Sequence, residues 1–335
     1  MSELSEKIFS IPDSMVSLEK EALRHERNLT YIDVGANNAA YVSIDGVLFN
    51  KSRTTLIKFP AKMAATVYVI PDSVTIIEDD AFGSCDNLES VIIPDSVERI
   101  GQQVFSNCNS LKEIVIPASV KEIGALAFSC CDALESVTLP DSVKLDGKVF
   151  LQCYNLFEFI VTDSSDEDKQ LRCVDNALYN SDGTVLVDYP IGLKRSDFTV
   201  PDGVTHIMPG TFEEAFSLKH VLLPETLVSI GHSAFCRCCA LESIIIPNGV
   251  ARIEQYTFLM CEKLVSVQLP ESLTTIEHSA FGSCDKLAEI RIPKDVTDIE
   301  YSAFMCCRNL TKVLLPDGLE SIEFGAFTHV NHYKQ

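Results

Sequence analysis

The stretch LESVIIPDSVERIGQQVFSNCNSL, residues 88–111, contains the unit from which most of the chain is built. A second full copy, LAEIRIPKDVTDIEYSAFMCCRNL, occupies residues 287–310. The shared pattern is L-x-x-[VI]-x-[IL]-P-x-x-V-x-x-I-x-x-x-A-F-x-x-C-x-x-L, and within each of two blocks it recurs every 23 residues. Such a period indicates a solenoid, in which each coil buries its apolar face against its neighbours. The register is given by the prolines Pro71, Pro94, Pro117, Pro140, Pro201, Pro224, Pro247, Pro270, Pro293 and Pro316.

Two longer islands interrupt the repeats, and they resemble each other. SIDGVLFNKSRTTLIKFP (43–60) matches CVDNALYNSDGTVLVDYP (173–190) at a constant offset of 130 residues. Each island has two short apolar runs around a polar turn, which predicts a β-hairpin. A weaker repeat lies between Ile11 and Leu29, with Leu23 in place of phenylalanine. We therefore expect one solenoid over residues 1–335, with a degenerate repeat at 1–29, an island at 30–70, repeats at 71–156, a second island at 157–200, and repeats to the end from 201 to 335.

The spacing within the unit predicts which side chains are buried. In L-x-x-V-x-I, alternation places Leu88, Val91 and Ile93 on the inner side of one short strand per coil, stacked in parallel at ~4.8 Å. Proline follows where the strand ends, and Phe105 fills the widest part of the coil. The predicted fold class is a repeat solenoid of the leucine-rich-repeat kind, a right-handed superhelix of parallel stacked short strands with two inserted β-hairpin islands.

Cysteine also occupies a column of the repeat. The chain has 13 cysteines, and eight of them lie three residues after the phenylalanine position. We expect a ladder of small buried side chains, because parallel side chains project alike and 13 is an odd number for disulfides. The C-x-C-C cluster Cys236, Cys238 and Cys239 leaves zinc as a less favoured alternative, since no second ligand pair lies nearby in the sequence. The eight column members are Cys85, Cys108, Cys131, Cys153, Cys238, Cys261, Cys284 and Cys307.

The repeat unit together with the "DGVLFN…LIKFP" islands resembles the BspA-like leucine-rich-repeat family over residues 8 to 328. The resemblance implies a surface or secreted protein of a host-associated microbe, involved in adhesion to host proteins and in aggregation with other cells. It transfers no catalytic residue, because the family motif is structural.

Composition excludes several classes of function. Hydrophobic residues make up 46% of the chain, which is enough for a large core. The formal net charge of −21 repels nucleic-acid backbones and anionic membrane surfaces. The start MSELSEKIFSIPDS contains no apolar signal region, and no run approaches the ~20 apolar residues of a membrane span. The sequence by itself predicts a cytoplasmic protein without membrane insertion, whereas the resemblance implies the cell surface.

The sequence contains none of the common catalytic motifs. G-x-G-x-x-G, G-x-x-x-x-G-K-[ST], H-E-x-x-H and G-x-S-x-G do not occur, and the seven histidines are scattered. The acidic run Asp163 to Asp168 lacks the loop glycine and the distal glutamate of a calcium-binding EF-hand, so we interpret it as a solvated loop. We expect no enzymatic activity, no cofactor and no resident metal.

The outward side of the strands is the best candidate for a functional site. One outward position per coil carries a large aliphatic side chain in six of nine coils, which suggests a partner-binding surface. The alternatives are that β-branched residues suit a strand, or that the islands cover the column. The predicted function is adhesin-like recognition of a protein partner by a monomer, with an intracellular interaction scaffold as the alternative. The predicted partner-binding residues are Ile92, Val115, Thr138, Ile160, Leu222, Ile245, Gln268, Arg291 and Leu314.

Overall fold

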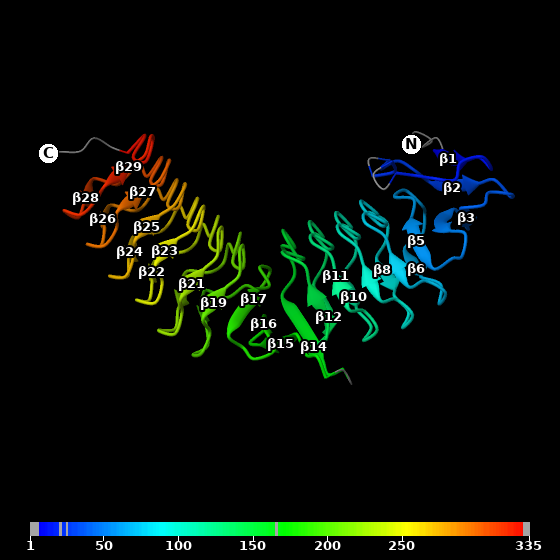
Figure 1. The fold of residues 1–335 in the computed structure, drawn as a ribbon, viewed down its shortest axis with the longest axis horizontal. Helices are drawn as coiled ribbons and strands as arrows, with labels where there is room; N and C mark the ends of the chain where they lie inside the picture. Colours follow the sequence, from blue (N-terminus) through cyan, green and yellow to red (C-terminus); the bar gives the residue numbers. More distant parts are fainter. Residues whose placement is uncertain (1–6, 20–21, 25, 165–166, 331–335) are drawn as a thin grey trace. The chain divides into compact units, whose positions relative to one another are not determined.

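The computed structural model describes residues 7–19, 22–24, 26–164 and 167–330. The chain divides into two compact units, Met1–Cys173 and Val174–Gln335, and each is a stack of coils (Figure 1). Throughout the described ranges the regular structure consists of β-strands, with no helix. The parallel stacked strands confirm the predicted leucine-rich-repeat solenoid.

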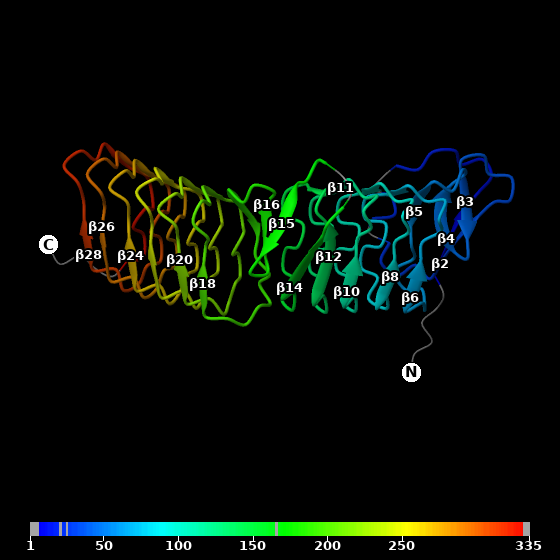
Figure 2. The ribbon, with the colours of Figure 1, turned by 90° about the horizontal axis from the view of Figure 1, so that it is seen from below.

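Each coil contributes one strand to an open sheet on one side of its unit (Figure 2). In the first unit Val69 pairs in parallel with Ile92, and Val115 with Thr138, whereas the strands that end at Ile92 and Val115 belong to separate hydrogen-bonded groups. In the second unit Ile245 pairs with Gln268, and Arg291 with Leu314. The strands are β6 (Val67–Val69), β8 (Ser90–Ile92), β10 (Glu113–Val115), β12 (Ser136–Pro140) and β14 (Glu158–Thr162), and then β18 (Asp197–Thr199), β20 (His220–Leu222), β22 (Ser243–Ile245), β24 (Ser266–Gln268), β26 (Glu289–Arg291) and β28 (Lys312–Leu314).

The prediction of one strand per coil was incomplete, because each coil contains a second strand of two residues. It follows the proline, as in β9 (Arg99–Ile100), which pairs in parallel with its neighbours on both sides. A strand of two residues is too short to show in the sequence the alternation of apolar and polar side chains. Its buried residue, Ile100, is the isoleucine of the repeat motif. The others are β7 (Ile76–Ile77), β11 (Glu122–Ile123), β13 (Lys144–Leu145), β19 (His206–Ile207), β21 (Ser229–Ile230), β23 (Arg252–Ile253), β25 (Thr275–Ile276), β27 (Asp298–Ile299) and β29 (Ser321–Ile322).

The recurring spacing of three residues in the motif corresponds to hydrogen-bonded turns. The carbonyl of Pro94 accepts the N–H of Val97 at 3.1 Å, which closes the turn after the first strand. The carbonyl of Phe105 accepts the N–H of Cys108 at 3.2 Å, and that of Cys108 accepts the N–H of Leu111 at 3.2 Å. The motif spacings P-x-x-V, F-x-x-C and C-x-x-L are therefore three successive changes of chain direction around the coil.

Between the second strand and the cysteine, amide groups alternate in the direction of their hydrogen bonds. The N–H groups of Phe82 and Ser84 donate to carbonyls of the next coil, those of Val104 and Ser106, at 2.8 Å each. The intervening Gly83 donates within its own coil, to the carbonyl of Asp80. This path places residues such as Ser84, at φ 64°, in the left-handed region, which costs a non-glycine residue about 1–2 kcal/mol.

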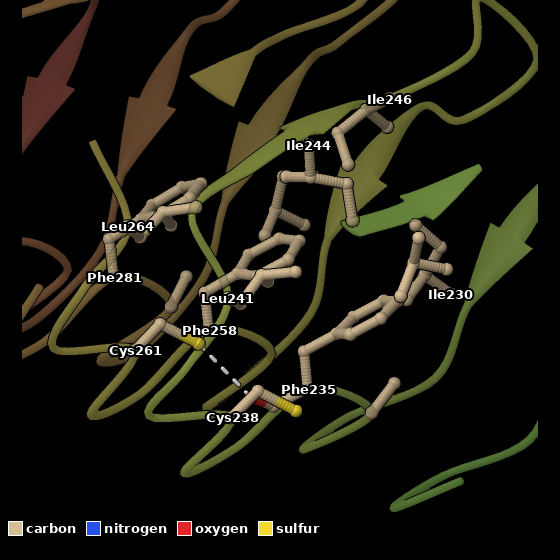
Figure 3. Close-up of a cluster of buried hydrophobic side chains, with 14 of the residues drawn as sticks. Ile230, Phe235, Cys238, Leu241, Ile244, Ile246, Phe258, Cys261, Leu264 and Phe281 are labelled. Atoms are coloured by element: carbon tan, nitrogen blue, oxygen red, sulfur yellow. Dashed lines mark hydrogen bonds between the residues drawn. The ribbon is translucent and has the colours of Figure 1, made fainter. Parts of the chain in front are cut away.

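The core of each unit is a ladder of phenylalanine rings with cysteine beside it. In the second unit Phe258 lies between Phe235 and Phe281, with ring centroids 5.3 and 5.2 Å away and interplanar angles of 9° (Figure 3). All three rings are fully buried. Leu241 and Leu264 of the motif pack in the same core. Rings stacked at this spacing join successive coils at the phenylalanine position of the motif.

The two islands form the predicted hairpins, with one strand more than expected. In the first, β3 (Tyr41–Ile44), β4 (Val47–Asn50) and β5 (Thr55–Lys58) are antiparallel, and β5 then pairs in parallel with β7. In the second, β16 (Ala177–Asn180) and β17 (Val185–Asp188) repeat the arrangement 130 residues later, including the bulge before the aromatic residue. The remaining strands are β1 (Ile8–Ile11), β2 (Tyr31–Val34) and β15 (Leu171–Val174).

Candidate functional site

The predicted partner-binding column lies on the open sheet of each unit. In the first unit Ile92 is 52% exposed and Val115 is 60% exposed, although their strand neighbours Val91 and Ile114 are buried. Ile160 is also exposed, and Thr138 is half-buried. The islands therefore do not cover this column, and that alternative is wrong. The alternation along each strand leaves apolar side chains in water on one side.

In the second unit the column changes character along the stack. Leu222 is 63% and Ile245 is 58% exposed, and the next two coils present Gln268 and Arg291 at the same position. The final member, Leu314, is exposed again. The surface of this unit is therefore aliphatic over β20 and β22 and becomes polar and then cationic over β24 and β26.

Two exposed residues of the open face were missed in the sequence, one in this column and one in the neighbouring outward column. Val69 pairs with Ile92 and is 59% exposed, and Val67 of the same strand is 53% exposed. They belong to β6, which follows the first island and lacks the leucine that opens the repeat motif. The signal that could have found them is the proline at position 71, since Val69 stands two residues before it as Ile92 stands two before Pro94.

A groove accompanies the column in the second unit. It has a volume of about 400 Å³ and runs across the coils from Ile245 to Arg291. A smaller hollow of about 270 Å³ extends it to Leu222 and shares Ile245 with it. Glu225 and Glu271, which follow the prolines, line the groove with the column. The fold thus brings four of the predicted residues, Leu222, Ile245, Gln268 and Arg291, to one concave feature.

Polar contacts between coils occupy the neighbouring outward column. Lys312 Nζ lies 3.0 Å from Glu289 Oε2, and His220 Nδ1 lies 3.0 Å from Asp197 Oδ1. Hydrogen bonds from Ser196 and His220 lower the pKa of Asp197. These exposed pairs contribute little stability, and they leave the edge of the apolar column hydrated.

The cysteine column is buried as predicted, and seven of its eight thiols donate a hydrogen bond to a backbone carbonyl. Cys261 Sγ donates to the carbonyl of Phe235 in the preceding coil at 3.1 Å (Figure 3), and Cys284 does the same to Phe258 at 3.2 Å. Burial raises the pKa of Cys261 and Cys284 well above that of a free thiol. All thirteen cysteines are free thiols. A thiol that stays protonated at neutral pH is a poor nucleophile and a poor metal ligand.

The three cysteines considered for zinc point to different surroundings. Cys238 donates to the carbonyl of Phe212 at 3.0 Å within the core ladder, whereas Cys239 donates to the carbonyl of Met260 at 3.6 Å. Burial raises the pKa of Cys236 to about 12. Among the described residues no group of three or more histidine, cysteine or acidic side chains is arranged to hold a metal ion.

The acidic run from Asp163 is anchored at its described residues by Asp141. Ser164 donates to Asp141 Oδ1 through its backbone N–H at 2.9 Å, and Lys169 Nζ lies 2.6 Å from Asp141 Oδ2. Burial alone would raise the pKa of Asp141, but the hydrogen bonds from Lys169 and Ser164 outweigh it and lower the pKa to about 2. Lys169 also pairs with Asp163 at 2.9 Å. Residues 165–166 of this run lie outside the described residues.

Stacked coils with an open parallel sheet and one aliphatic ladder define a leucine-rich-repeat solenoid. A family model, the BspA type leucine rich repeat region, matches six copies over residues 64–170, 192–307 and 229–335. The chain belongs to the BspA type leucine-rich repeat family, which confirms the resemblance seen in the sequence. In the described part of the chain, no helix has the length and apolar character needed to cross a membrane.

Solved structures of bacterial proteins share the fold. A leucine-rich repeat protein from Eubacterium ventriosum is 20% identical with a TM-score of 0.64, over 89% of this chain and 94% of that chain. A leucine rich cell surface protein from Faecalibacterium prausnitzii is 25% identical with a TM-score of 0.53, over 88% and 86%. A leucine-rich repeat protein from Bacteroides ovatus is 28% identical with a TM-score of 0.52, over 87% and 83%. A search of curated protein sequences found no match.

Proposed function

We propose that this chain is a non-catalytic recognition protein that binds a protein partner, as a monomer, through the open strand face of its coils. The observation that carries the proposal is the column of aliphatic side chains left in water, with Val115 at 60% and Leu222 at 63% exposed. Soluble proteins rarely expose apolar side chains in register over successive strands unless a partner covers them. Repeat proteins commonly bind through such an extended surface.

The adhesin-like form of the proposal places the chain at a cell surface. Its support is the similarity to a leucine rich cell surface protein at 25% identity. The second candidate is an interaction scaffold inside the cell, and its support is the thirteen free thiols, which suit a reducing compartment. Protease treatment of intact cells followed by immunoblotting distinguishes the two, because only a surface protein is cleaved while the membrane is closed.

The binding surface is tested with the triple variant Ile92→Glu, Val115→Glu and Ile245→Glu. All three side chains are more than half exposed, so we expect the thermal unfolding temperature to change little. Three carboxylates in the column oppose an apolar contact, so we expect the variant to lose the proteins that the wild-type chain retains from lysates of its own cells or of host cells. Retention of the same proteins by a folded variant would refute the proposal.

A matched control carries the same three added charges away from the open sheet. Met208, Val228 and Met260 are exposed apolar residues outside the open-face strands. Their substitution by glutamate adds the same charge as the test variant, so a purely electrostatic effect of three carboxylates would appear in both proteins. We expect the control to retain the partners.

A further inference from the structure

The groove of the second unit contains a cation with no counter-ion. Five of the ten arginines lie beside carboxylates, as Arg252 does at 2.7 Å from Glu277. Among the described residues, Arg27, Arg53 and Arg172 are exposed without an ion pair, but they do not line the groove. Arg291, which lines the groove and is exposed, has no ion pair or side-chain hydrogen bond within residues 7–19, 22–24, 26–164 and 167–330. Its acidic strand neighbour Glu289 is engaged by Lys312 at 3.0 Å. In a chain of net charge −21, an unpaired guanidinium at the end of a concave surface points to an anionic group supplied by a ligand.

The lining of the groove favours recognition of side chains over strand addition. Its lining includes Pro247, Pro270 and Pro293, which have no N–H donor, and the strand-end residues Ile246 and Leu269, which are buried in the core. Of the strands beside it, β22 already pairs in parallel with β24, as Ile245 does with Gln268, and β26 pairs with β28. A ligand must therefore run across the strands, along the stack of coils. Glu225 and Glu271 also line the groove, and an ionised carboxylate there would accept N–H groups from the ligand's main chain.

The distance between Ile245 and Arg291 along the groove fits a bound peptide in the polyproline II conformation better than one in an extended strand. Ile245 and Arg291 occupy the same position two coils apart, which is about 9.6 Å at the ~4.8 Å separation of neighbouring strands. A polyproline II helix repeats every three residues and rises about 9.3 Å in that distance. In a fully extended strand, side chains on the same face repeat every two residues, after about 6.6 Å, and this distance does not match the separation of Ile245 and Arg291. The polyproline II backbone also leaves its N–H groups free for the two carboxylates.

We propose that this groove binds a peptide segment of a protein partner in the polyproline II conformation, with an aliphatic side chain on Ile245 and a carboxylate, three residues away, on Arg291. The inference rests on the proposed function and specifies the partner chemistry for the second unit. It predicts that a strongly acidic protein selects an acidic peptide, which is the opposite of what net charge alone favours.

The test uses phage-displayed random 12-residue peptides selected on the full chain at 150 mM salt. We expect enrichment of sequences in which an aliphatic residue and an aspartate or glutamate stand three positions apart, in either order. Synthetic peptides of the selected sequences should then lose affinity about tenfold or more with Arg291→Glu and with Ile245→Glu, as measured by fluorescence anisotropy. A second selection on Arg291→Glu should replace the acidic residue by lysine or arginine.

The control Arg308→Glu makes the same charge change at a side chain outside the groove, and it should alter affinity less than twofold. The inference is overturned if no peptide is enriched, if the enriched peptides lack the acidic residue, or if Arg291→Glu leaves their affinity unchanged. The triple glutamate variant distinguishes failure of this inference from failure of the proposed function. Partners lost by the triple glutamate variant would still support binding through the open face, whereas partners retained by that variant would refute the open face itself.

Discussion

Replacing Phe258 by alanine tests the idea that each coil is held by the ring ladder. Phe258 is fully buried and contacts a parallel ring on both sides, at 5.3 and 5.2 Å. A buried phenylalanine truncated to alanine costs about 3–5 kcal/mol. Because each aromatic pair adds roughly 0.5–1.5 kcal/mol beyond burial, and two pairs are lost here, we expect the upper end, ~5 kcal/mol.

The matched control is Phe327→Ala, at the last ring of the described ladder. Phe327 is half-buried and stacks on Phe304 at 5.2 Å. With less area buried, its truncation should cost about half as much, ~2 kcal/mol. The assay is urea unfolding followed by tyrosine fluorescence, because the chain has nine tyrosines and no tryptophan. Equal costs for Phe258→Ala and Phe327→Ala, or a cost below about 1 kcal/mol for Phe258→Ala, would refute the reasoning.

Two further predictions concern a carboxylate and a backbone angle. The pKa of Asp141 is lowered from 3.8 to about 2 in the folded state, so its pairing with Lys169 contributes stability above pH 3.8 that is lost as the pH falls through 2. The urea midpoint of wild type should therefore exceed that of Asp141→Asn at pH 6 and converge with it near pH 2, and a constant difference would contradict this. Ser233 has φ 57° where the preceding coil has Gly210, so Ser233→Gly should stabilise the protein by roughly 0.5–1 kcal/mol in the same assay, whereas Ser229→Gly in a strand should destabilise it.

The sequence predicted the inner and outer positions of the first strand because alternation and register act together. Val91 is buried and Ile92 exposed because they are adjacent on a strand, and the 23-residue period repeats that outcome in every coil. The cysteine column was predictable for the same reason. The acceptor of each thiol was not, because the carbonyl that Cys261 meets belongs to Phe235, 26 residues away in another coil.

The groove was not predictable from the repeat motif, because it depends on the turn that follows each proline. Glu225 and Glu271 occupy a variable position of the unit, and only the path of the turn places them in one groove with Ile245 and Arg291. The second strand of each coil was missed because two residues show no alternation. In both cases the deciding contacts are made between coils, and a sequence pattern within one coil does not report them.

The alternating amide hydrogen bonds have a consequence for how such a chain changes length. Phe82 and Ser84 satisfy carbonyls of the following coil, and that coil offers the same groups to the one after it. Removing one complete coil brings together two coils that carry the same hydrogen-bond donors and acceptors. Removing half of a coil leaves buried carbonyls without donors. We therefore expect the fold to tolerate deletions and duplications of complete coils. Each such change adds or removes one strand of the open face, and with it one residue of the exposed column.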